Sequence, residues 1–227
     1  MIVDMNAELG EAVAKDIGGV FAAADVTDTD QVIAAVEAAK EMAPLRAVVT
    51  AAGIGWASRT IGRDGTYESA HDMGAFNKVV QVNLVGTFNT ARLAATAMSQ
   101  NEPVDEDGQR GAIVTVTSVA GLEGQIGQVS YSASKGGVIG MTLPMARDLA
   151  VAGIRVNCIA PGLIDTPIYG SGPASDEFKS KLKRDVLFPD RLGSSREFAS
   201  MAAELITNDY MNAELVRVDG GLRFQPK

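Results

Sequence analysis

Two residues capable of acid–base chemistry, Tyr131 and Lys135, stand four positions apart in the run Tyr-Ser-Ala-Ser-Lys. Residues at this spacing share one face of an α-helix, so a phenol and an ammonium group would lie together. A phenol titrates near 10, and a neighbouring cation stabilises the phenolate and lowers its pKa. Ser118 precedes Tyr131 by thirteen residues and could hydrogen-bond the same substrate oxygen. The trio suits proton transfer coupled to hydride transfer on an alcohol or ketone.

The spacing of Tyr131 and Lys135 is weak evidence by itself, because many exposed helices carry such a pair. Supporting signals are three runs of small residues, at 50–55, 117–121 and 160–162, each close to the end of an expected strand. Ligands of open α/β sheets bind beyond the carboxyl ends of the strands, and small residues let a flat ligand approach the backbone. Each run taken singly is typical of a tight turn, whereas together they favour a ligand cleft.

Asn83 is a further candidate, because it follows Val79 and Val80 at helical spacing on what should be an inward-facing stripe. A buried amide needs hydrogen-bond partners. Either neighbouring backbone groups supply them, or the side chain holds a water or a backbone group beside Tyr131 and Lys135. The sequence leaves both interpretations open.

Short runs of β-branched and apolar residues alternate along the chain with longer runs of helical period. This order predicts an α/β fold, a doubly wound Rossmann-type parallel sheet with helices on both faces, in a single domain of residues 1–227. Strands are expected at 2–4, 20–23, 46–51, 112–117, 154–159 and 215–218. The segment 166–190, with a charged helix at 176–187, is expected to form a mobile flap beside the site. Pro144 should kink the helix of Tyr131 or end it early.

The composition excludes several classes of protein. The 227 residues carry 20 basic and 28 acidic side chains, a net charge of −8, which disfavours nucleic acid and anionic membranes as partners. One cysteine and one histidine rule out a disulfide framework and a Cys/His zinc site, so no metal is implied. With no apolar run long enough to cross a bilayer and no recognisable signal peptide, a cytoplasmic protein acting on a small molecule is expected.

Taken in order along the chain, these residues resemble the short-chain dehydrogenase/reductase family over nearly the whole sequence. The positions similar to the catalytic set of that family are Asn83, Ser118, Tyr131 and Lys135. Other family marks are matched by Asp25-Val26, Ala52-Gly53, Pro161-Gly162 and Thr166. Within the family, runs such as 124–128, 140–144 and 219–221 are most similar to the type II 3-hydroxyacyl-CoA dehydrogenases.

The resemblance implies an NAD-dependent oxidation of a secondary alcohol, such as that of a 3-hydroxyacyl-CoA, to a ketone. It implies that Tyr131 is the general base and that Lys135 lowers its pKa and binds the nicotinamide ribose. In the same pattern Ser118 orients the substrate oxygen, Asn83 holds a proton-relay water, and Gln125 contacts substrate. The remaining cofactor contacts that it implies are Asp25, Val26, Ala52, Gly53, Pro161, Gly162 and Thr166. A homo-oligomer, in most members a tetramer, is also implied.

Asp4 closes the first expected strand, and an acidic residue there can bond the ribose 2′-hydroxyl and repel a 2′-phosphate, which favours NAD over NADP. The alternative interpretation of Asp4 is a capping role at the end of the strand. A Rossmann unit carries its glycine-rich phosphate loop about 20 residues before such an acidic residue, and no G-x-G-x-x-G occurs here. We therefore expect an N-terminally truncated fold that begins at the family's second strand and binds NADH weakly. Thr50 also stands where the family often has asparagine.

Three functions follow from these expectations. The first is an oxidoreductase that transfers a hydride between NAD and a 3-hydroxyacyl-CoA. The second is a 3-oxoacyl-carrier-protein reductase or another alcohol or steroid dehydrogenase, which shares the same four catalytic residues. The third is a non-catalytic homologue that keeps the fold without binding coenzyme, because the sequence either starts too far downstream or truly lacks the pyrophosphate site.

Overall fold

Parallel β-strands in two sheets form the centre of this computed structural model, which describes residues 1–166, 169–170 and 172–225. The strands are β1 (Ile2–Asp4), β2 (Phe21–Ala23), β3 (Ala47–Thr50), β4 (Gly111–Val116), β5 (Ile154–Pro161) and β6 (Leu215–Val218). β1 pairs with β2 in one sheet, and β3, β4, β5 and β6 lie in that order in the other, with every pair parallel. The predicted α/β class is confirmed, and each strand lies within two residues of its expected position.

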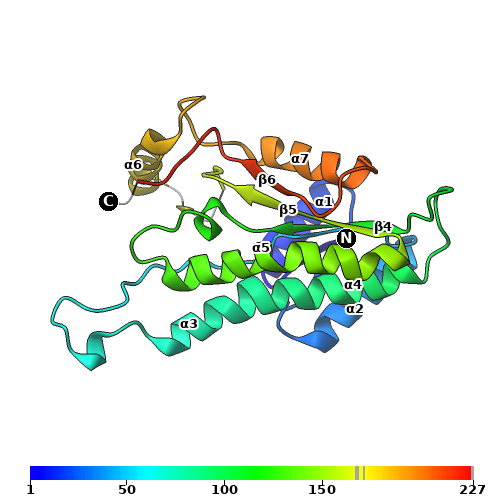
Figure 1. The fold of residues 1–227 in the computed structure, drawn as a ribbon, viewed down its shortest axis with the longest axis horizontal. Helices are drawn as coiled ribbons and strands as arrows, with labels where there is room; N and C mark the ends of the chain where they lie inside the picture. Colours follow the sequence, from blue (N-terminus) through cyan, green and yellow to red (C-terminus); the bar gives the residue numbers. More distant parts are fainter. Residues whose placement is uncertain (167–168, 171, 226–227) are drawn as a thin grey trace.

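Helices pack on both faces of the four-stranded sheet, as Figure 1 shows. They are α1 (Ala7–Asp16), α2 (Thr29–Met42), α3 (Met73–Val80), α4 (Thr87–Ser99), α5 (Val129–Leu149), α6 (Pro173–Leu182) and α7 (Ser195–Thr207). Helices α4 and α5 cover one face of the sheet, and α7 covers the other. Asp28 caps the start of α2, because its carboxylate accepts from the amides of Asp30 and Gln31.

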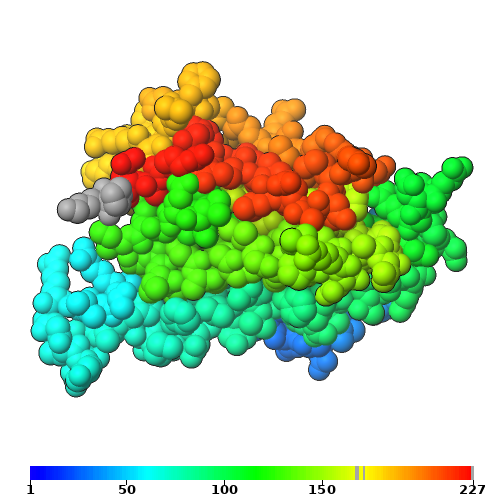
Figure 2. All heavy atoms as spheres, in the orientation of Figure 1, coloured from blue at the N-terminus to red at the C-terminus, as the bar shows by residue number. Residues whose placement is uncertain are grey.

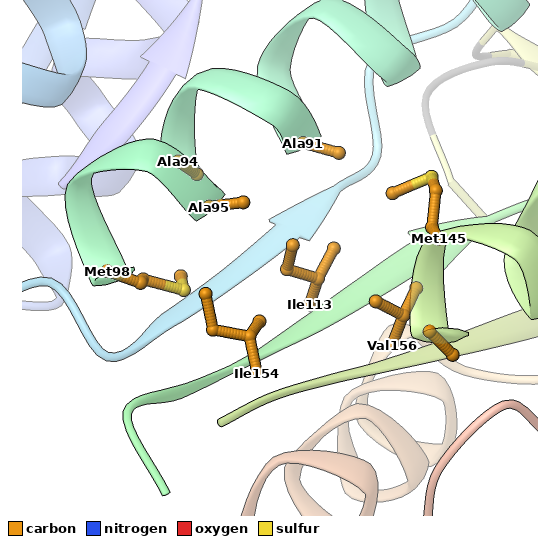
Figure 3. Packing of buried hydrophobic residues seen from close by; sticks show 9 residues of the cluster. Ala91, Ala94, Ala95, Met98, Ile113, Met145, Ile154 and Val156 are labelled. Carbon is orange, nitrogen blue, oxygen red and sulfur yellow. The ribbon is translucent and has the colours of Figure 1, made fainter. Parts of the chain in front are cut away.

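The core follows from the alternation of side chains along the central strands. Ile113 of β4 points toward α4 and α5, whereas its neighbour Val114 points toward α7. In the first cluster, shown in Figure 3, one face of α4 with four small or flexible residues meets the sheet. These residues are Ala91, Ala94, Ala95 and Met98. Because three of the four are alanines, α4 can lie close to β4 and β5.

Pro144 lies within α5, which continues unbroken from Val129 to Leu149. Of the two outcomes expected for this proline, a kink or an early end of the helix, the early end is therefore wrong. A proline removes the hydrogen bond to the carbonyl four residues earlier, which here belongs to Gly140. Gly140 is exposed, with open space beside it, so water can solvate that carbonyl at little cost.

A gap separates the two sheets, because β1 and β3 are not paired with one another. A cavity of about 700 Å³ lies between them, with mainly apolar walls that include Val3, Val48 and Ala94. Thr50 also borders this cavity, and its buried hydroxyl has no hydrogen-bond partner among the described residues. The pairing of parallel strands is thus interrupted between β1 and β3.

The segment 166–190 contains a shorter helix than the sequence suggests. The charged helix expected at 176–187 is α6, which begins at Pro173 and ends at Leu182. Residues 167, 168 and 171 of the expected flap lie outside the described residues. In the part of the chain that the structure describes, no helix is long and apolar enough to cross a bilayer.

Candidate active site

The carboxyl ends of β3, β4 and β5 lie at one edge of the sheet, since the strands are parallel and in register. Gly53 follows β3, Ser118 follows β4, and Pro161 and Gly162 stand at the end of β5. The three runs of small residues predicted from the sequence are therefore neighbours in space. Tyr131 and Lys135 approach the same edge from the first turns of α5.

Asn83 connects two of these segments, the turn after β3 and the start of α5, from a fully buried position. Its Oδ1 accepts from the amide of Ile54 at 2.8 Å, and its Nδ2 donates to the carbonyl of Ile54 at 3.0 Å. The same Nδ2 donates to Oγ of Ser134 at 3.1 Å. These contacts agree with the interpretation in which neighbouring backbone groups satisfy the buried amide of Asn83. The amide holds the turn after β3 against α5.

Asn83 lies in a π-helical turn, Gln81–Gly86, that joins α3 to α4. Such turns insert one extra residue into a helix and are frequent at functional sites. Helical spacing from Val79 indicated only that Asn83 faces inward. The π-helical turn itself was not predicted, because its backbone pattern depends on the surrounding packing.

Lys135 is almost completely buried, with 4% of its surface exposed. Its Nζ donates to the carbonyl of Val116 at 3.0 Å and lies 5.8 Å from the centroid of the Tyr131 ring. That distance is within the range of a cation–π contact. The loss of water around the ammonium lowers the pKa of Lys135 to about 8. The nearby thiol of Cys158 acts in the opposite direction and raises that pKa, but desolvation has the larger effect.

Tyr131 shows the opposite effect of burial. The loss of water raises the pKa of its phenol above the ordinary value, and a hydrogen bond with the side chain of Ser118 partly offsets the rise. The sequence suggested that Lys135 lowers this pKa. In the structure the desolvation of the phenol outweighs any such lowering, and the ammonium is hydrogen-bonded to the carbonyl of Val116. At neutral pH the phenol therefore carries its proton.

Two hydroxyls that the sequence analysis did not single out fix the start of α5. Oγ1 of Thr117 donates to the carbonyl of Lys135 at 2.6 Å, and Oγ of Ser134 donates to the carbonyl of Tyr131 at 2.7 Å. Both hydroxyls thereby restrain the backbone of the two candidate catalytic residues, Tyr131 and Lys135. Ser134 directly precedes Lys135 in the Tyr-Ser-Ala-Ser-Lys run, and this adjacency was the signal available in the sequence.

The predicted cofactor residues of the first sheet lie at its carboxyl end. Asp4 ends β1 and is exposed, and its Oδ1 accepts from the amide of Asn6 at 2.8 Å. Asp25 accepts from the amide and the hydroxyl of Thr27. Val26 borders the cavity between the sheets. The carboxylate of Asp4 thus makes a local capping contact, and its second oxygen makes no hydrogen bond to a described residue.

The other predicted residues lie farther along the strand edge. Gly162 donates its amide to the carbonyl of Val218 at 3.0 Å, and an added Cβ there would collide with Asp219. Thr166 follows this turn, and its carbonyl accepts from the amide of Tyr169. Gln125 stands apart in the turn before α5, where it borders a separate surface pocket.

The resemblance implies a nicotinamide cofactor, so the fit of the described residues to this group can be tested. Gly53 leaves space beside the site, where an added Cβ would lie 3.2 Å from Oδ1 of Asn83 and 3.5 Å from Nζ of Lys135. Lys135 borders this space, the ring of Tyr131 lies 5.8 Å from its Nζ, and Pro161 stands at the end of β5. These residues fit the nicotinamide and its ribose. For the pyrophosphate the sequence offers no G-x-G-x-x-G turn.

Comparison with known proteins identifies the family. A model described as short chain dehydrogenase matches residues 1–176. The chain belongs to the short-chain dehydrogenase family, and it is an oxidoreductase.

Individual relatives agree with this assignment. The chain is 46% identical to a protein of Bos taurus named 3-hydroxyacyl-CoA dehydrogenase type-2, over 100% of this chain and 86% of that protein. A crystal structure of 3-hydroxyacyl-CoA dehydrogenase type-2 from Mycobacterium avium superposes with a TM-score of 0.92 and 48% identity, covering 99% of this chain and 86% of that one. A 3-oxoacyl-[acyl-carrier-protein] reductase of Rattus norvegicus is 33% identical over 98% of this chain and 86% of its own length.

Proposed function

We propose that this protein interconverts a 3-hydroxyacyl-CoA and the corresponding 3-oxoacyl-CoA with NAD as the hydride carrier. The observation that carries the proposal is the convergence of Asn83, Ser118, Tyr131 and Lys135 at one strand edge. The similarity to proteins named 3-hydroxyacyl-CoA dehydrogenase type-2 supports the choice of substrate.

When bound, the cofactor would supply the redox chemistry, in which a hydride moves between its nicotinamide ring and the substrate carbon that bears the oxygen. We assign the nicotinamide and ribose contacts to Gly53, Tyr131, Lys135, Pro161 and Gly162. A further set at the strand ends is assigned to the rest of the cofactor by resemblance; it consists of Asp4, Asp25, Val26, Ala52 and Thr166. The free oxygen of Asp4 supports NAD rather than NADP, since a carboxylate repels a 2′-phosphate.

The proton is transferred at Oη of Tyr131. Because burial keeps the phenol protonated at neutral pH, it can donate its proton to the oxygen of a ketone in the reducing direction. In the oxidising direction the phenolate takes the proton of the alcohol. Ser118 interacts with the Tyr131 side chain and is placed to hold the same substrate oxygen. The ammonium of Lys135 stabilises the phenolate as it forms.

The assay that tests this function is the oxidation of NADH with acetoacetyl-CoA. It is run at millimolar NADH, since the sequence carries no glycine-rich phosphate turn. The chain should turn over this substrate, and Tyr131→Phe should lower kcat by roughly 10²- to 10⁴-fold, the usual contribution of a general acid. Tyr210→Phe, at a fully exposed tyrosine, is the matched control and should keep the full rate. An unchanged rate in Tyr131→Phe would refute the assigned acid.

The second candidate function is a 3-oxoacyl-carrier-protein reductase, which the relative from Rattus norvegicus favours. A higher kcat/KM with a carrier-protein thioester and NADPH than with the coenzyme A thioester and NADH would select it. The absence of turnover with either pair would select a non-catalytic homologue. A cytoplasmic location and a homotetramer complete the proposal, and sedimentation of the purified chain measures its oligomeric state.

A further inference from the structure

Arg217 of β6 donates to acceptors in two other segments of the chain as well as in its own. Its Nη1 donates to Oε1 of Glu123, in the turn after β4, at 2.6 Å. Its Nη2 donates to the carbonyl of Leu222 at 2.8 Å, and its Nε donates to Oδ2 of Asp219 at 2.6 Å. Because the guanidinium is planar and rigid, these contacts fix the positions of the acceptors relative to one another.

The turn that Arg217 holds is the one that carries Ser118. The amide of Gly121 donates to the carbonyl of Ser118 at 2.9 Å, and the amide of Glu123 donates to the carbonyl of Val119, also at 2.9 Å. These hydrogen bonds close residues 118–123 into a short unit. A movement of Glu123 at one end of the unit is therefore passed on to Ser118 at the other end.

The turn is also packed against the carboxyl-terminal segment. Val119 and Leu222 are 1% and 0% exposed and belong to one apolar cluster, and Leu222 is the residue whose carbonyl Arg217 binds. In Figure 1 β6 (red) runs beside the turn that follows β4 (green), and in Figure 2 the atoms of the two segments lie side by side. Arg217 thus supports both attachments of the turn, the charged one at Glu123 and the apolar one at Val119.

The surroundings of the ion pair strengthen it. The side chains of Arg217 and Glu123 are only 22% and 28% exposed, so water screens them less than it screens a fully exposed pair. Hydrogen bonding by Arg217 keeps the pKa of Glu123 below its ordinary value, so the carboxylate is charged at neutral pH. Arg223 and Asp219 add one further charge of each sign, because Nε of Arg223 lies 3.5 Å from Oε1 of Glu123 and Asp219 accepts from both arginines.

Ser118 is assigned above to hold the substrate oxygen within reach of Tyr131, and such a contact depends steeply on position. A displacement of about 1 Å can cost on the order of 100-fold in rate. We propose that Arg217 is a positioning residue, which acts through Glu123 to hold Ser118 at the substrate oxygen. The inference deepens the proposed function, because it rests on the role given there to Ser118.

A double-mutant cycle between Glu123 and Ser118 tests the inference. Glu123→Ala should lower kcat for the reduction of acetoacetyl-CoA by roughly 10- to 100-fold. In a Ser118→Ala background the same substitution should have little further effect, because the group that it positions is already absent. Glu123→Gln, whose amide oxygen can still accept from Arg217, should recover part of the rate. Glu37→Ala removes a carboxylate from an exposed ion pair in α2 and is the matched control, which should keep the full rate.

A second measurement needs neither coenzyme nor turnover. The side chains of Ser118 and Tyr131 are hydrogen-bonded, so the resonance of the phenol carbon of Tyr131 reports the position of Ser118. It is recorded in protein labelled with carbon-13 tyrosine and assigned by its absence in Tyr131→Phe. Glu123→Ala should shift this resonance in the same direction as Ser118→Ala does. Glu37→Ala should leave it in place.

The outcomes separate the inference from the proposed function. An equal fold loss of kcat on Glu123→Ala in both backgrounds would overturn the inference, since Glu123 would then act independently of Ser118. A resonance of Tyr131 that moves in Ser118→Ala and stays in place in Glu123→Ala would overturn it as well. If the unmodified chain does not turn over acetoacetyl-CoA, the proposed function fails, and the resonance of Tyr131 alone decides whether Glu123 holds Ser118.

Discussion

Lys135 illustrates how single residues in this site combine a functional gain with a cost in stability. Its ammonium is buried with one backbone carbonyl, that of Val116, as its acceptor. A buried cation without a carboxylate partner destabilises the folded state at any pH at which it is charged. Its position over the ring of Tyr131 is the functional reason to keep it.

The pKa of about 8 gives this cost a pH dependence. The folded pKa lies below the ordinary lysine value of 10.5, so between these two values the unfolded chain binds the additional proton. The free energy of unfolding therefore rises with pH across that window. Below pH 8, Lys135→Met should be more stable than the unmodified chain, by about 1–3 kcal/mol, and the difference should shrink toward pH 10.

Urea denaturation of both proteins from pH 6 to pH 10 measures this difference. Lys78→Met, at an exposed lysine of α3, is the control, and its effect should not vary with pH in this way. A Lys135→Met protein that is less stable than the unmodified chain at pH 7 would contradict the argument.

At the scale of the elements, the π-helical turn Gln81–Gly86 sets the position of Asn83 between the end of β3 and α5. The turn must also lie close to the segment after β2. Gly86 makes this approach possible, because a Cβ added there would lie 2.4 Å from Cγ2 of Val26. Real carbon atoms do not come that close, so any larger residue moves the turn or the valine.

Gly86→Ala should therefore lower the free energy of unfolding by about 1–3 kcal/mol, although alanine favours helix more than glycine does. Adding Val26→Ala removes the colliding methyl group and should recover part of the loss relative to Val26→Ala alone. Gly140→Ala is the matched control, because Gly140 lies in α5 with open space around it, and it should stabilise by about 0.5–1 kcal/mol. Thermal or urea unfolding of the unmodified chain, Gly86→Ala, Val26→Ala and the double variant measures the coupling between positions 26 and 86. Additive effects of the two substitutions on the free energy of unfolding would argue against the clash.

At the scale of the whole molecule, the two sheets differ in how well they are supported. β4 pairs on both sides and is buried on both faces, whereas β1 pairs only with β2 and its other edge meets the cavity of about 700 Å³. The first helix also leaves apolar residues in water; Leu9, Val13 and Ile17 are each about half exposed or more. Few buried contacts and an unpaired edge are the features of a region that opens locally.

Hydrogen exchange of the backbone amides should therefore be much faster in β1, α1 and β2 than in β4 and β5. The expected protection in β4 and β5 approaches that of global unfolding, while residues 2–23 exchange through local opening. Mass spectrometry of peptides from the two regions measures the difference in the unmodified chain. Equal protection of both regions would show that the first sheet is as firmly attached as the second.

Local patterns in the sequence were enough to predict the parallel α/β class, the strand positions, and the shared helix face of Tyr131 and Lys135. These features depend on periodicity and spacing, which act over a few residues. The proline in α5 was the exception, because whether a helix continues past a proline depends on what surrounds the carbonyl that loses its partner.

Only the tertiary structure decided the partners of Asn83 and the raised pKa of Tyr131. Each of these depends on atoms from segments distant in sequence. Desolvation in particular is a property of everything that surrounds a group, so its direction could not be read from the spacing of Tyr131 and Lys135. The sequence by itself therefore determined which residues are candidates for the chemistry and in what order they stand, and the packing of the chain decided their protonation and surroundings.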